Sequence, residues 1–185
     1  LAALGFTSFE AAHAMVHKVL RKFVEGVDIL SFARDWGGND GKGIRTLLAT
    51  RALRRIGINK PTFAQLKRRT GVSLYVNATD LHGCVPVYYD PVKTPDADVI
   101  DAVYASFAVP PFFAPIRSGQ HLLVDGGIME NIPRITPLKA PEKCLVLRID
   151  DSNDGGLETK VSCVQDYVSR LVQCAQRCRV QGDKQ

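Results

Sequence analysis

The chain lacks long apolar runs: none approaches the roughly 20 residues that a membrane-spanning helix needs. It also lacks a regular cysteine framework, because its cysteines are five in number, irregularly spaced and without a C-x-x-C pair. This pattern argues against paired disulfides and against a zinc site, and it favours a reducing compartment. We therefore expect no metal, and a cytoplasmic or peripheral membrane location rather than secretion. The cysteines are Cys84, Cys144, Cys163, Cys174 and Cys178.

Two local patterns fall short of the sites they resemble. Residues 36–43 are rich in glycine, but the Gly41-Lys42 pair has no following Ser or Thr and no first glycine at the spacing of a phosphate-binding loop. We predict a flexible loop there instead. Asn77 begins a glycosylation acceptor sequence, yet it lies in an apolar run typical of a strand, which predicts a buried backbone.

The composition is that of one globular domain. The chain has 185 residues, of which 45% are hydrophobic and 23% are charged, enough for a single domain over residues 1–185. The net charge of +5 comes largely from the first seventy residues. That charge indicates solvated helix faces or, alternatively, attraction to an anionic membrane surface. No nucleic-acid-binding motif accompanies it, so no nucleic acid partner is expected.

Helical and strand patterns alternate along the chain. Continuous rather than alternating apolarity at 121–124 and 144–149 predicts a sheet covered on both faces, and therefore an α/β domain. In the helix from Ile44, the residues Leu47, Leu48, Leu53 and Ile56 form the expected apolar side. The predicted helices are 7–26, 44–56, one beginning at 61–62, 98–107 and 157–180, and the predicted strands are 72–79, 85–89 as an edge, 121–124 and 144–149.

Three stretches, in this order, carry a family resemblance. They are Val76-Asn77-Ala78-Thr79-Asp80-Leu81, then residues 104–115 with Ala105-Ser106-Phe107-Ala108-Val109-Pro110, then Val124-Asp125-Gly126-Gly127 followed by Asn131 and Pro133. Together they resemble the patatin-like phospholipase family. The resemblance covers most of residues 1–150 and is followed by the predicted helix at about 157–180.

The resemblance implies a three-layer α/β/α fold and a lipid acyl hydrolase that uses a Ser-Asp dyad without a cofactor. Asp125 matches the catalytic aspartate, which accepts the serine proton directly. Gly126 and Gly127 would shape the turn beside the nucleophile, and Asn131 would support the loop that follows. The implied substrate is a phospholipid or another acyl-ester lipid.

The nucleophile itself has no match. The family's G-x-S-x-G turn and its glycine-rich oxyanion segment do not occur in this sequence. Ser106 lacks the flanking glycines of a strained turn and matches a structural position of the family. His82 and His121 are expected at the surface or behind the site, because the dyad needs no histidine.

Two hypotheses follow. The first is that the chain is the C-terminal portion of a patatin-like lipid acyl hydrolase, truncated at its N-terminus, since residues 1–5 read as the end of a helix. The second is a non-catalytic module whose basic helices bind an anionic membrane or a protein partner. A nucleic-acid-associated protein is a third, weaker alternative.

Overall fold

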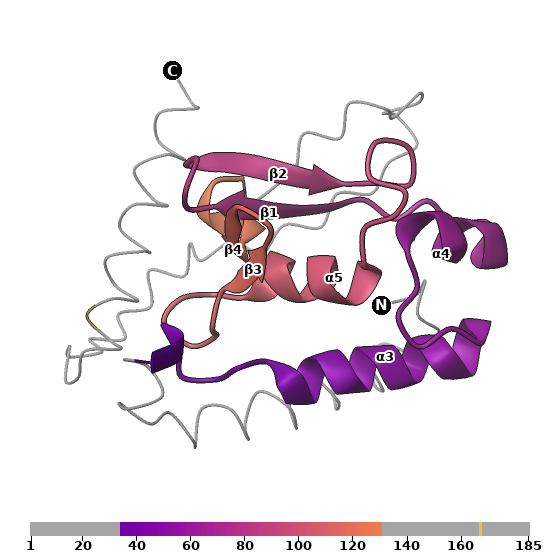
Figure 1. The fold of residues 1–185 in the computed structure, drawn as a ribbon, viewed down its shortest axis with the longest axis horizontal. Coiled ribbons are helices and arrows are strands. Elements are labelled where there is room, and N and C mark those ends of the chain that lie inside the picture. Colours follow the sequence, from indigo (N-terminus) through magenta and orange to yellow (C-terminus); the bar gives the residue numbers. More distant parts are fainter. Residues whose placement is uncertain (1–33, 131–166, 168–185) are drawn as a thin grey trace, which may run out of the picture.

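The computed structural model describes residues 34–130 and Tyr167 (Figure 1). The predictions for residues 7–26, 144–149 and 157–180, and for Asn131, lie outside the described residues. The described helices are α3 (Lys42–Ile56), α4 (Phe63–Thr70), α5 (Val99–Phe107) and the short 3-10 helix η2 (Gly126–Ile128). The described strands are β1 (Val76–Asp80), β2 (Val85–Tyr89), β3 (Ile116–Ser118) and β4 (His121–Asp125).

The four described strands form one sheet in the order β2-β1-β4-β3, and every neighbouring pair is antiparallel. Strands β1 and β2 form one hairpin, β3 and β4 form a second, and the pairing of β1 with β4 joins the two. All five residues of β1 are buried, as are the three middle residues of β4. Both faces of these strands are therefore covered, as the continuous apolarity predicts, and the α/β class is confirmed.

The helices lie in layers beside the sheet. Helix α5 packs against β1 and β4, and α3 packs against α5 on the side away from the strands (Figure 1). The ring of Tyr104 on α5 lies in the core between them, and its hydroxyl donates a hydrogen bond of 2.8 Å to the carbonyl of Ala114. This packing holds the 108–115 segment against the end of α5.

Short polar signals set where two helices begin, and both positions are confirmed. Asp98 caps α5, because its Oδ1 accepts hydrogen bonds from the backbone N–H groups of Ile100 and Asp101. Thr62 caps α4 in a reciprocal capping box with Gln65. The pattern at 61–62 therefore predicts the helix start to within one residue.

The predicted apolar side of α3 is wrong at Leu53, which is 49% exposed. The buried stripe instead includes two alanines, Ala49 and Ala52, whose small side chains let α3 approach α5 closely. Leu53 lies roughly 100° further round the helix than Ala52, outside that stripe. Leu47 lies roughly 100° from the buried Leu48, at the border of the stripe, and is only partly buried.

Two predicted segments differ from the structure. The strand predicted at 72–79 begins only at Val76, because β2 ends at Tyr89, the residue opposite Val76, and offers no partner further along. The loop at 36–43, predicted to be flexible, is fixed by backbone hydrogen bonds from Gly38 to the carbonyl of Pro111 and from Ala114 to that of Asn39. Strand β2 lies at the edge of the described sheet, as predicted.

Candidate active site

Asp125 is the last residue of β4 and the N-cap of η2. Its backbone is held at both polar groups: the N–H donates to the carbonyl of Ala108 at 3.1 Å, and the C=O accepts from Thr79 Oγ1 at 2.9 Å. Its side chain is oriented by Gly127, whose N–H donates to Oδ1 at 2.6 Å. The three stretches that carry the family resemblance therefore meet at Asp125.

The surroundings of Asp125 make its carboxyl a better proton acceptor than an ordinary aspartate. Burial raises the pKa of Asp125 from 3.8 to about 6, although the hydrogen bond from Gly127 N–H acts in the opposite direction. A general base works best when its pKa lies near the operating pH, since it is then both deprotonated and basic. Asp125 Oδ2 accepts no hydrogen bond from any residue in the described ranges.

Gly126 is required by close packing rather than by an unusual backbone angle. A Cβ atom at this position would lie 2.6 Å from both the backbone oxygen and the side-chain nitrogen of Asn77. Asn77 is 8% exposed, so its backbone is buried as predicted. The first glycine of the Asp125-Gly126-Gly127 turn thus lets η2 lie directly on β1.

The loop after η2 is anchored from β1 and β2. Asn77 Nδ2 donates a hydrogen bond of 3.0 Å to the carbonyl of Glu130, and the hydroxyl of Tyr88 bonds to the Glu130 carboxylate. These contacts fix the chain five residues beyond Asp125. The sequence predicted only a buried backbone at Asn77. Its side chain in addition supports the site by anchoring this loop.

Asp80 is the polar residue that sequence reasoning missed. Its carboxylate is only 3% exposed and accepts hydrogen bonds at 3.1 Å from the backbone N–H groups of His82 and Leu122. Its second oxygen lies 2.8 Å from Nδ1 of His121. The hydrogen bond from His121, helped by those from Leu122 and His82 and opposed by burial, lowers the pKa of Asp80 from 3.8 to about 2.

His82 and His121 are both exposed and lie where the two hairpins turn, whereas Asp125 is at the other end of β4. His121 pairs with Asp80, and His82 Nδ1 lies 2.7 Å from the carbonyl of Gln120 in the β3–β4 turn. Ser106 lies on α5, and no hydrogen bond of the described residues joins it to Asp125. Within the described part of the chain, no group of three His, Cys, Asp or Glu side chains could hold a metal ion.

We predict that Asp80→Asn weakens the joint between the two hairpins and lowers the thermal midpoint by several degrees at neutral pH. Because the folded-state pKa of Asp80 lies below its ordinary value, its stabilising contribution is complete above about pH 4 and disappears as the pH falls to about 2. Urea unfolding of the wild type and of Asp80→Asn from pH 2 to pH 6 measures this pH dependence of the free energy of unfolding. The two stability curves should converge at low pH, and parallel curves would contradict the assignment.

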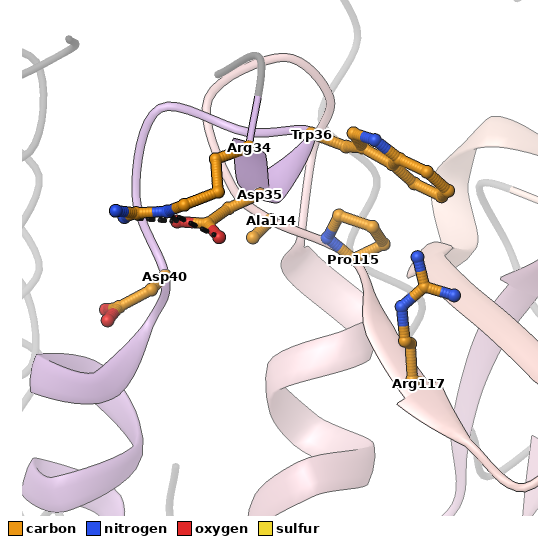
Figure 2. A pocket seen from close by; sticks show the side chains of 7 residues that line it. All are labelled: Arg34, Asp35, Trp36, Asp40, Ala114, Pro115 and Arg117. Carbon is orange, nitrogen blue, oxygen red and sulfur yellow. Dashed lines mark hydrogen bonds and ion pairs between the residues drawn. The ribbon is translucent and has the colours of Figure 1, made fainter. Parts of the chain in front are cut away.

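A pocket of about 230 Å³ opens beside the fixed 36–43 loop (Figure 2). The Asp35 carboxylate in its wall is held by Arg34 at 2.8 Å, and the Arg117 guanidinium lies 4.6 Å from the centre of the Trp36 ring. None of the predicted site residues lines this pocket. Its lining residues are Arg34, Asp35, Trp36, Asp40, Ala114, Pro115 and Arg117.

The fold and site define an α/β protein with a partly buried carboxylate at the junction of a central strand and a glycine turn. The sequence model of the patatin-like phospholipase family matches residues 1–137. Because this match covers well over half of the chain, the protein belongs to the patatin-like phospholipase family.

A curated relative agrees with this assignment. The chain is 29% identical over 72 residues to the probable lipid hydrolase 463L of Invertebrate iridescent virus 6. The matched segment is 39% of this chain and 25% of that relative, so it spans a quarter of the relative's length. Across the described residues, no helix is long and apolar enough to cross a bilayer.

Proposed function

We propose that this chain is part of a lipid acyl hydrolase in which Asp125 accepts the proton of a serine nucleophile. The observation that carries the proposal is the Asp125 carboxyl: burial raises its pKa to about 6, Gly127 orients one of its oxygens, and no described residue donates a hydrogen bond to the other. Family membership and the viral relative support a lipid substrate with an acyl ester bond. Capping η2 alone does not require a carboxyl whose pKa is raised by burial, which favours the catalytic role over a module that only binds membranes.

The reaction proceeds in two halves. The serine Oγ attacks the ester carbonyl while its proton passes to Asp125, and the protonated Asp125 then delivers that proton to the departing alcohol oxygen. In the second half a water molecule attacks the acyl-serine, Asp125 takes the water proton, and the proton returns to the serine as the fatty acid leaves. The same carboxyl serves both halves, and no metal or cofactor enters either step.

The nucleophile is assigned to a part of the protein outside these 185 residues. The sequence contains no G-x-S-x-G turn, and a serine on an ordinary helix, such as Ser106 on α5, lacks the exposed strand-to-helix turn that activates a nucleophile. Asp125 therefore supplies one member of a pair.

Labelling with a serine-reactive phosphonate tests the proposal on the full-length protein. We expect the reagent to abolish hydrolysis of a fluorescent phospholipid and to modify one serine, which peptide mass spectrometry places outside the 185 residues. Modification of Ser106 or of another serine in this sequence would contradict the proposal. So would a full-length protein that hydrolyses no acyl ester.

A further inference from the structure

The sequence has an acid-free stretch that the proposed chemistry does not explain. Residues 41–79 contain no Asp or Glu, although nine Lys and Arg residues occur there. The stretch runs from just before α3 to the last residue but one of β1 and includes the whole of α4. The nine residues are Lys42, Arg45, Arg51, Arg54, Arg55, Lys60, Lys67, Arg68 and Arg69.

Six of these cations gather where α3 and α4 end. The two helices contact each other, and Figure 1 shows their C-terminal ends at the same side of the molecule. All six side chains are exposed, and none forms an ion pair with a carboxylate of the described residues. We call this surface the α3–α4 basic face; its cations are Arg54, Arg55, Lys60, Lys67, Arg68 and Arg69.

Two large aliphatic side chains lie among the cations in the sequence. Leu53, next to Arg54, is 49% exposed, and Val72, three residues after Arg69, is 45% exposed. Neither side chain belongs to the buried core of the described residues. Exposed apolar groups thus neighbour, in the sequence, cations that have no carboxylate partner among the described residues.

Helix stability does not account for this amount of charge. One or two cations in a last turn are enough to complement the helix dipole, whereas α4 has three and Lys60 belongs to neither helix. Like charges on one face repel each other, so the face is most stable against an outside surface of negative charge. An outside surface with an apolar layer close beneath its charges would in addition accommodate Leu53 and Val72.

We propose that the α3–α4 basic face docks the protein on an anionic phospholipid bilayer. The guanidinium and ammonium groups contact headgroup phosphates and carboxylates, while Leu53 and Val72 enter the boundary between headgroups and acyl chains. This inference rests on the proposed function, because docking on a bilayer is useful to a lipid hydrolase whose substrate lies in that bilayer. Nucleic acid offers the charge but no apolar layer for the aliphatic groups.

Sedimentation with vesicles tests the docking surface. We expect the whole protein to bind vesicles of phosphatidylcholine with one third phosphatidylserine, to release them at high salt, and to bind pure phosphatidylcholine weakly. Arg68→Glu should lower the partition coefficient on the order of tenfold, because one attractive charge is lost and one repulsive charge is gained. Unchanged binding by Arg68→Glu would overturn the proposal.

Arg117→Glu is the matched control for charge. Arg117 is also exposed and has no carboxylate partner among the described residues, but it lies on β3, away from the ends of α3 and α4 (Figure 1). Its reversal should change vesicle binding by less than about twofold, since distant charges are screened. An equal loss of binding in both variants would show that net charge alone is responsible and would overturn the proposal.

The Leu53→Gln variant distinguishes binding of the α3–α4 basic face to a bilayer from its binding to nucleic acid. Since Leu53 is half exposed, folding tolerates the change, but vesicle binding should fall roughly fivefold from the loss of apolar insertion. Binding of a labelled DNA duplex that Leu53→Gln leaves unchanged, together with absent vesicle binding, would assign the face to nucleic acid instead. Vesicle binding needs no hydrolysis, so an inactive protein that binds would contradict only the proposed function.

Discussion

Asp125→Asn in the full-length protein is expected to lower kcat for acyl-ester hydrolysis by at least about 10⁴-fold. Asparagine has the same shape and retains an oxygen that can accept from Gly127 N–H. It cannot take up a proton, however, so the serine is no longer deprotonated as it attacks. Initial rates on a fluorescent phospholipid, with the lipid in excess, measure the loss directly.

The wild-type pH profile tests the same assignment without a mutation. Because the folded-state pKa of Asp125 is about 6, the basic form is complete above that pH and is lost as the pH falls below it. We expect kcat/KM to fall tenfold for each pH unit below about 6. A profile that is flat from pH 5 to pH 8 would contradict the role of Asp125.

The stability of Asp125→Asn distinguishes loss of chemistry from loss of fold. A carboxyl with a raised pKa favours the folded state while protonated and ceases to do so as the pH rises through about 6, so the neutral Asn should not lower the melting temperature at pH 8. Asp96→Asn, the same change at an exposed carboxylate, is the matched control and should keep full activity. An Asp125→Asn protein with activity within tenfold of wild type would refute the assignment.

Gly126→Ala has the second largest expected effect. The new Cβ would lie 2.6 Å from the backbone oxygen of Asn77, which belongs to a buried strand and cannot move independently. Overpacking of this kind costs about 3 kcal/mol in the free energy of unfolding. Because η2 has to shift away from β1, the Gly127 N–H also leaves Asp125 Oδ1, and hydrolysis should fall with stability.

Urea unfolding gives the loss in free energy of unfolding for Gly126→Ala and for the control Gly119→Ala. The difference between the two losses measures the effect of packing alone. Gly119 has φ of 59°, but no atom lies within 4 Å of the Cβ that alanine would add. Its substitution should therefore cost only the strain of a left-handed residue, about 1 kcal/mol. If both variants lost equal stability, close approach to Asn77 would not explain Gly126.

Local signals predicted the parts of this fold that depend on a few neighbouring residues. The helix starts at 61–62 and at 98 were predicted, and the structure adds that Thr62 and Asp98 cap these helices through hydrogen bonds to residues two or three positions further on. The Asp125-Gly126-Gly127 turn was predicted for the same reason, since the carboxylate caps the turn that follows it. The single domain over residues 1–185 and the role of Asp125 stay predictions.

Features that depend on strand register could not be predicted in this way. Asp80 bonds to His121 and Leu122 only because β1 lies antiparallel to β4, which no local pattern specifies. Strand β3 was missed because it has only three residues and pairs solely with β4 among the described strands. The sequence also contained no sign that residues 36–43 would bond to the 111–114 segment.

The sheet order also determines when the site can assemble during folding. Each hairpin closes a short loop and can form early, whereas the pairing of β1 with β4 joins residues more than forty positions apart and has to overcome a larger entropy of loop closure. The hydrogen bond between Thr79 and the Asp125 carbonyl spans that late contact. The carboxyl of Asp125 therefore becomes partly buried, and its basicity rises, only when the two hairpins dock. In a chain in which only the separate hairpins have folded, Asp125 is an ordinary aspartate.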